Sequence, residues 1–170
     1  AAIRAATDKP FGINHVLFRI DEEAYAATLQ ARPLLAAFAW ARKDQDLRGY
    51  FRRAHDAGLK VMHMAGEVPE AVRAAEAGAD FIVAQGMEGG GHVGWMAALA
   101  LVPMVVNAVA PVPVLAAGGI ADGRGLAAAL ALGADGALLG PRFLATSEAP
   151  IPPDLKQAIV KSDGHDTVLT

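Results

Sequence analysis

The chain has 170 residues, of which 54% are hydrophobic, and this is enough for one compact domain with a sizeable core. Its 15 basic and 18 acidic residues leave a formal charge of -3 without long runs of like charge, which excludes the basic surface of a nucleic-acid-binding protein. The absence of cysteine excludes disulfides, thiolate catalysis and cysteine-ligated metals. No apolar stretch is long enough to span a bilayer and the first residues do not resemble a signal peptide, so we expect a cytoplasmic protein with no membrane partner.

Short apolar runs alternate with alanine-rich amphipathic stretches along the chain. After a helix tail at 1–8, the predicted strands are 11–18, 34–40, 60–64, 81–84, 114–117 and 137–139. The predicted helices are 22–31, 45–57, 69–77, 95–109, 123–132 and 154–161, and a polar turn is expected at 162–166. The strands are mostly apolar on both faces, which is typical of a buried parallel sheet, so an α/β fold built from βα units is expected.

A glycine stands between helix and strand at three places, namely Gly58, Gly78 and Gly133. Glycine adopts the left-handed conformation that ends many helices, so the same helix-glycine-strand unit is predicted three times. This repeat does not by itself distinguish a closed barrel from an open doubly wound sheet.

A glycine-rich segment follows the strand predicted at 81–84 and contains Gln85, Glu88 and His92. Glycines let the backbone approach a flat or anionic ligand closely, and in parallel barrels the functional residues gather at the carboxyl ends of the strands. The neutral imidazole of His92 could take a proton from a carbon acid at physiological pH. A flexible loop with a surface histidine is the alternative interpretation.

Glycines also end the last two predicted strands, at Gly118 and Gly119 and again at Gly140. The first pair lies just before Asp122, which is suited to cap the next helix, and the free N–H groups of that turn form a candidate anion site. Two successive strand ends of this kind match the phosphate grip of (β/α)₈ barrels, which follows strands seven and eight. A tight βα turn that needs glycine only for packing is the alternative.

The expected fold is therefore a (β/α)₈ TIM barrel, present as one partial domain over residues 1–170. Counting back from the phosphate grip makes the six predicted strands the third to the eighth, so the first two strands are expected to be missing. The resulting open edges are expected in a fragment, in an incompletely described chain, or in a form stabilised by association such as a homo-oligomer.

The remaining polar residues have weaker patterns. Asn14 is a candidate inward-facing amide, and His63 could face the same cavity or be a buried histidine bonded to the backbone. His15 and His165 lack a supporting pattern, and His55 is interpreted as a surface residue. No group of His, Asp and Glu has metal-site spacing and no serine lies in a nucleophile elbow, so no metal is expected.

Taken together, these motifs resemble the nitronate monooxygenase (2-nitropropane dioxygenase) family of FMN-dependent TIM-barrel enzymes. The resemblance runs over essentially the whole chain and is carried by residues 10–14, 84–94, 116–124, 140–143 and 166–170. It implies that His92 is the catalytic base and that the flavin ring is contacted by Asn14, Gln85 and Gly90. The residues implied to hold its phosphate are Gly118, Gly119, Leu138, Leu139, Gly140 and Pro141.

The resemblance also implies the reaction, which is the FMN-dependent oxidation of a small nitronate or nitroalkane by oxygen to a carbonyl compound and nitrite. Two residues depart from the family pattern. Pro141 replaces the usual threonine and so removes a hydroxyl and a backbone N–H that could reach phosphate, and Gly89 replaces an alanine and loosens the loop. The family's first strand and its substrate-covering domain are expected to be missing as well.

Two other interpretations stay open. A flavin-dependent enoyl-ACP reductase shares the Gly-Gly-His loop and the phosphate grip and would oxidise NAD(P)H, and no separate dinucleotide fingerprint decides the matter. Alternatively, the chain is a non-catalytic barrel fragment that binds flavin weakly or pairs with another chain.

Overall fold

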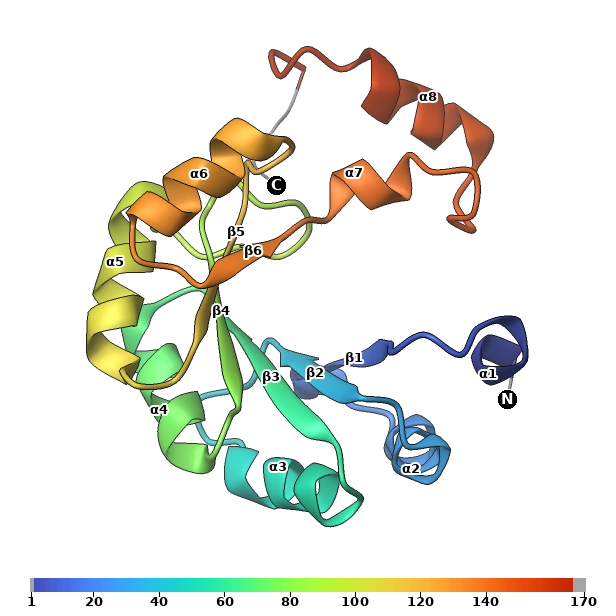
Figure 1. Ribbon diagram of the computed structural model, residues 1–170, viewed down its shortest axis with the longest axis vertical. Coiled ribbons are helices and arrows are strands. Elements are labelled where there is room, and N and C mark those ends of the chain that lie inside the picture. Colours follow the sequence, from blue (N-terminus) through green and yellow to red (C-terminus); the bar gives the residue numbers. More distant parts are fainter. Residues whose placement is uncertain (1, 167–170) are drawn as a thin grey trace.

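The computed structural model describes residues 2–166 as one curved parallel sheet with helices packed against its outer side (Figure 1). The strands are β1 (Gly12–Val16), β2 (Leu35–Ala39), β3 (Lys60–Ala65), β4 (Phe81–Gln85), β5 (Val114–Ala117) and β6 (Gly136–Leu138). They are hydrogen-bonded in the order β1-β2-β3-β4-β5-β6, and every pair is parallel. Each strand thus lies beside its neighbours in sequence, as in the wall of a TIM barrel, whereas the strand order of a doubly wound sheet reverses.

The helices are α1 (Ala2–Ala6), the short 3-10 helix η1 (Leu17–Arg19), α2 (Glu22–Ala31), α3 (Leu47–Asp56), α4 (Val68–Ala77), α5 (Ala98–Val109), α6 (Gly123–Ala131), α7 (Pro141–Leu144) and α8 (Pro153–Lys161). Those from α2 to α6 connect consecutive strands and cover one face of the sheet (Figure 1). In Figure 1, α7 and α8 follow β6 and extend away from the layer formed by α3 to α6.

Local sequence explains where most of these helices begin and end. Asp21, Asp46 and Asp122 accept hydrogen bonds from the first free N–H groups of α2, α3 and α6, respectively. The three glycines predicted to precede strands have positive φ angles, which are 82° at Gly58, 102° at Gly78 and 92° at Gly133. The predicted helix-glycine-strand repeat is therefore confirmed.

The core lies between the sheet and the helices. One residue from each of the first five strands pairs with the next to form a row across the sheet, and all five side chains are buried on the helix side. The row consists of His15, Phe38, His63, Ile82 and Val114. Side chains alternate between the two faces of a strand, so the residues between these point to the inner face of the curved sheet. In a barrel the inner face forms a packed interior, and the functional side chains lie where it meets the carboxyl ends of the strands.

Most predicted boundaries agree with the structure to within two residues, and the differences have local causes. The strand predicted at 11–18 ends at Val16 because the chain turns there into η1. The helix predicted from residue 95 begins at Ala98, because the Met87 N–H donates to the Met96 carbonyl and keeps that stretch in the loop. Helix α7 was not predicted. Residues 1 and 167–170 lie outside the described part, and the latter include most of the segment 166–170 that carries part of the resemblance.

Candidate active site

Gln85 is the last residue of β4 and belongs to the inner face of the sheet, since its neighbour Ala84 packs in the helix-side core. It pairs with Ala117 of β5, which in turn pairs with Leu138 of β6, so one row crosses the three strand ends. Gln85 is only 7% exposed, yet its Oε1 has no hydrogen-bond partner among the described residues. A buried amide oxygen without a partner costs about 1–3 kcal/mol, so Gln85 is a candidate for contact with a ligand.

The glycine-rich loop after β4 lies directly on the end of β5. The Gly86 N–H donates to the Ala117 carbonyl over 2.9 Å. A Cβ atom on Gly118 would lie 3.1 Å from both the Gly86 oxygen and the Gly89 nitrogen, and Gly118 has a φ of 104°. Only glycine fits this close backbone contact, so the two predicted glycine motifs form a single structure.

Glu88 ties the same loop to α5. Both of its carboxylate oxygens accept from the Ala98 N–H, at 3.1 and 3.0 Å, so Glu88 caps the helix from ten residues upstream. Its Cβ lies 3.3 Å from where a Cβ on Gly119 would be, and Gly119 has a φ of 67°. The Ala98 N–H at the start of α5 is therefore satisfied within the chain, and Glu88 packs beside Gly119.

The turn after β6 completes this arrangement. A Cβ on Gly90 would lie 3.8 Å from the Cγ of Pro141, which is the first residue of α7. Proline suits this position because the first N–H groups of a helix have no intrahelical partner. Hence Gly90, Gly118 and Pro141 bring together the ends of β4, β5 and β6.

The predicted use of the α6 N-terminus as an anion site needs correction. Asp122 accepts hydrogen bonds from the N–H groups of Arg124 and Gly125, so these donors are already satisfied. The Arg124 side chain also binds Asp122, and this hydrogen bond, followed by those from the backbone, holds the pKa of Asp122 below its usual range. At the start of α7, the N–H groups of Phe143 and Leu144 are likewise satisfied, by the Gly140 carbonyl.

His92 lies in the same loop but near the other strands. Its exposed imidazole is 5.8 Å from the ring of Phe18, after β1, and 5.4 Å from the ring of Trp40, after β2 (centroid distances). The loop contacts β3 as well, since a Cβ on Gly66 would lie 3.2 Å from Gly94. Sequence reasoning did not single out Phe18 and Trp40, although both stand at the carboxyl ends of predicted strands, where barrel sites gather.

Asn14 lies on the same face of the sheet as Gln85 but is not in contact with it. It lies on β1 in the row that continues through Ala37 and Met62, and this row belongs to the inner face. Its side chain is exposed and makes no hydrogen bond to another described residue. The structure therefore puts Asn14 and Gln85 on the same face without joining them directly.

His15, His55 and His63 have structural partners on the helix side. His63 is fully buried, as one of its two predicted alternatives had it, but its Nε2 lies 3.1 Å from the Glu70 carboxylate and not at a backbone group, and the predicted cavity position is wrong. His15 is buried against Thr28, and burial lowers its pKa while Asp21 opposes this. His55, half-exposed, bonds Asp80. Within residues 2–166 no group of side chains has the makings of a metal site.

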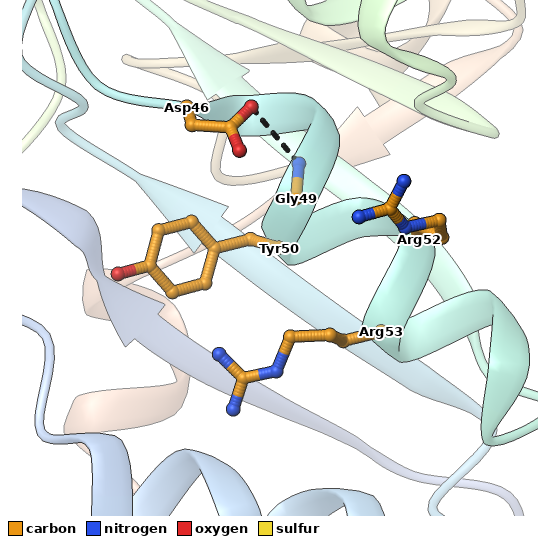
Figure 2. A pocket seen from close by; sticks show the side chains of 5 residues that line it. All are labelled: Asp46, Gly49, Tyr50, Arg52 and Arg53. Carbon is orange, nitrogen blue, oxygen red and sulfur yellow. Dashed lines mark hydrogen bonds between the residues drawn. The ribbon is translucent and has the colours of Figure 1, made fainter.

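A shallow hollow of about 330 Å³ lies on the outside of α3 (Figure 2). None of the predicted site residues lines it; the lining residues are Asp46, Gly49, Tyr50, Arg52 and Arg53. Asp46 caps the helix through Gly49, and both Tyr50 and Arg53 bind Glu22 of α2. These polar groups hold α2 against α3, so the candidate site remains at the carboxyl ends of the strands.

Comparison with known proteins agrees with this arrangement. A (3aS,4S,5R,7aS)-5-hydroxy-7a-methyl-1-oxo-octahydro-1H-indene-4-carboxyl-CoA dehydrogenase of Mycobacterium tuberculosis is 40% identical over 171 residues, which is 99% of this chain and 47% of the relative. The structure of FabK from Thermotoga maritima superposes with a TM-score of 0.90 at 38% identity, over 99% of this chain and 53% of that chain. The nitroalkane oxidase of Streptomyces ansochromogenes has a TM-score of 0.81 at 31% identity, over 92% and 57% of the two chains.

The chain spans about half the length of these relatives. No helix in the described part of the chain has the length and hydrophobicity to cross a bilayer. The family model for nitronate monooxygenase matches residues 25–170, which includes every strand end of the site except that of β1. This chain therefore belongs to the nitronate monooxygenase family, whose members are flavin-dependent oxidoreductases.

Proposed function

We propose that this chain carries the flavin-binding and proton-transfer residues of an enzyme that oxidises small alkyl nitronates or nitroalkanes with oxygen, giving carbonyl compounds and nitrite. The observation that carries the proposal is the buried, unpartnered Oε1 of Gln85, beside Gly89 of the loop that also bears His92. A buried amide with a free acceptor suits a flat heterocycle with ring N–H and carbonyl groups.

The residues present fit FMN. Gln85, Asn14 and the Gly90 backbone would contact the ring, while Gly118 and Gly119 with the turn of Leu138, Leu139, Gly140 and Pro141 would hold the phosphate. Bound FMN would supply the electron transfer between substrate and oxygen. Proline at position 141 has no backbone N–H, so the phosphate has one donor fewer than with the threonine usual in the family. We therefore expect the affinity for FMN to be lower than with threonine.

His92 would act on the substrate's proton. No described residue hydrogen-bonds to its exposed imidazole, so both ring nitrogens remain open to substrate. A neutral imidazole can take the α-proton of a nitroalkane, whereas a nitronate has already lost it. His92 would then only orient the nitronate oxygens.

The difference between nitroalkanes and nitronates allows the role of His92 to be tested. In the enzyme containing this chain, His92→Asn should retain bound FMN and lower turnover of neutral nitroalkanes by on the order of 10²–10⁴-fold, while turnover of preformed nitronates falls much less. Oxygen uptake with nitroethane and with propionate 3-nitronate measures the two rates, and the visible spectrum measures the flavin. An equal loss on both substrates would show that His92 is not the base.

A second candidate function is oxidoreduction of an acyl thioester with a nicotinamide cofactor. It is favoured by the similarity over 99% of this chain to a protein named as a carboxyl-CoA dehydrogenase. Oxidation of NADH with a crotonyl thioester would support this candidate, and oxygen uptake with propionate 3-nitronate would support the first. A chain that stays colourless and elutes as an oligomer in size-exclusion chromatography would instead support a non-catalytic module that pairs with another chain.

A further inference from the structure

Trp40 has a backbone conformation that its side chain does not favour. It directly follows β2 and has a φ of 62°, one of two positive values among the non-glycine residues described. A bulky residue in the left-handed region is strained and persists only where the surrounding structure imposes it. Such residues cluster at functional sites, so the contacts of Trp40 are informative.

Those contacts fix both the backbone and the ring. The Trp40 carbonyl accepts the Phe18 N–H over 2.9 Å, which joins the chain after β2 to the chain after β1. The Cη2 atom of the ring lies 4.0 Å from where a Cβ on Gly66 would be, and Gly66 touches Gly94 in the loop of His92. The indole therefore reaches from β2 across the end of β3 to the loop that carries the histidine.

The indole ends beside the imidazole. The Trp40 and His92 centroids are 5.4 Å apart with the planes inclined by 46°, and Phe18 approaches at 5.8 Å and 51°. These aromatic contacts restrict the exposed imidazole, whereas no described residue hydrogen-bonds to its nitrogens. A histidine in a loop with five glycines needs such restraint, because a general base works only within hydrogen-bond reach of the proton it removes.

We propose that Trp40 is a positioning residue, which together with Phe18 holds the His92 imidazole at the carboxyl edge of the sheet for proton transfer. The inference rests on the proposed role of His92 as the base. The left-handed conformation is the means by which the indole, at the end of its strand, is turned toward the glycine-rich loop instead of continuing the alternation of β2.

The test combines a structural and a kinetic measurement on three variants. Trp40→Leu removes the aromatic ring, Trp40→Phe keeps one, and Trp95→Leu removes a tryptophan that is 83% exposed in the same loop as His92. The imidazole proton resonances of His92, assigned by NMR through their loss in His92→Asn, report its surroundings in this chain. Steady-state kinetics with nitroethane and a preformed nitronate report its function in the enzyme.

We expect Trp40→Leu to move the His92 resonances, since the ring current of the indole is lost, and to lower kcat for nitroethane by on the order of 10–100-fold with little change in KM or in nitronate turnover. Trp40→Phe should restore most of kcat, and Trp95→Leu should leave the His92 resonances in place. Unchanged His92 resonances in Trp40→Leu would overturn the proposal, as would equal losses of kcat in Trp40→Leu and Trp40→Phe.

A second variant covers the case in which Trp40→Leu folds poorly. Phe18→Leu should also move the His92 resonances, because it removes the other aromatic ring beside the imidazole. If the resonances move as expected but the unsubstituted enzyme does not turn over nitroalkanes, then Trp40 positions His92 for another reaction, and it is the proposed function that fails.

Discussion

At Gly118 the chain requires glycine for two separate reasons. Its φ of 104° is unfavourable for any other residue, and an added Cβ would lie 3.1 Å from backbone atoms of Gly86 and Gly89. Backbone atoms cannot move aside as the end of a flexible side chain can. The contact of Gly118 with the loop after β4 therefore depends on the absence of one methyl group.

We predict that Gly118→Ala lowers the free energy of unfolding by about 1–3 kcal/mol and weakens flavin binding at the same time. Urea unfolding and a flavin titration measure the two effects. Gly123→Ala is the matched control, because nothing lies within 4 Å of its added Cβ and its φ is not positive. This control should be neutral or slightly stabilising, since alanine is the better helix former. A Gly118→Ala protein that behaves like the control would refute the close contact.

Gly89 offers a second test at the same loop. The sequence suggested that glycine here only loosens the loop, but an added Cβ would lie 2.8 Å from the Nε2 of Gln85. Gly89 therefore gives room to the buried amide. We predict that Gly89→Ala displaces Gln85 and changes the bound-flavin absorbance spectrum while the unfolding midpoint changes little. An unaltered spectrum would show that the amide does not contact the flavin.

The strain at Trp40 can be measured apart from its role beside His92. Trp40→Ala and Trp40→Gly remove the same ring, but only glycine adopts a φ of 62° without strain. We predict that the glycine variant is the more stable of the two by about 1 kcal/mol in urea unfolding. At an ordinary surface position the order would be reversed, so a more stable alanine variant would mean that the backbone is not left-handed in solution.

The sequence predicted Gln85, Gly118 and His92 as site residues because a residue type and its place after a strand were both visible. It did not predict the conformation of Trp40, since that φ is imposed by contacts with Phe18 and Gly66, far away in the chain. The mistake at His63 has a related cause. In a strand that is apolar on both faces, the periodicity does not show which face is inner, and only the pairing with Phe38 and Ile82 decides.

At the scale of elements, the helix-glycine-strand repeat contains a further regularity. Asp80 stands before β4, where its N–H donates to the Val61 carbonyl and its Oδ2 accepts the Val61 N–H. Asp135, before β6, binds both backbone groups of Val114 in the same way. One aspartate therefore sets the register of each of these strand pairs. The sequence showed the repeat, but not that its aspartates bind the preceding strand.

Asp80 makes the stability of the fold depend on pH. Burial tends to raise the pKa of its carboxyl, but hydrogen bonds from Lys60, from the Val61 N–H and from His55 outweigh burial and hold the pKa below its usual range. A carboxyl with a lowered folded-state pKa stabilises the fold above its unfolded-state pKa of about 3.9, and this stabilisation is lost as the pH falls through the folded-state pKa.

We therefore predict that Asp80→Asn is less stable than the parent chain at pH 7 by about 1–2 kcal/mol, and that the difference shrinks below pH ~4. Thermal unfolding followed by circular dichroism between pH 3 and 7 measures it. Asp44→Asn, at a side chain that is 87% exposed, should follow the parent at every pH. A constant difference between Asp80→Asn and the parent would indicate lost packing rather than a lost charge.

Helix boundaries were predicted where the cap residue lies next to the helix, as Asp122 does for α6. They were missed where the cap comes from a distance. The N–H of Ala98 at the start of α5 is satisfied by Glu88 across the glycine-rich loop, and nothing in the local sequence of α5 shows this. The four residues of α7 are likewise too few for a periodic pattern to be recognised.

For the whole molecule, the decisive question is whether the convergent loops hold FMN. We predict that the purified chain shows the visible spectrum of bound flavin when FMN is added, and that FMN at 100 times its Kd raises the free energy of unfolding by about 2.7 kcal/mol. Gly119→Leu should abolish both effects, because its side chain would occupy the space through which the backbone is proposed to approach the phosphate. No shift at saturating FMN would show that the strand ends described here do not suffice for binding.

The order of the strands in the sheet is also the order of the strands in the chain. Each strand finds its partner across a single helical connection, so the loop that must close is short at every step, and no strand has to wait for a distant segment before it pairs. During synthesis the β1–β2 pair and α2 can form while later strands are still in the ribosome, and each new βα unit adds to an existing edge. The sheet can thus grow vectorially, one βα unit at a time.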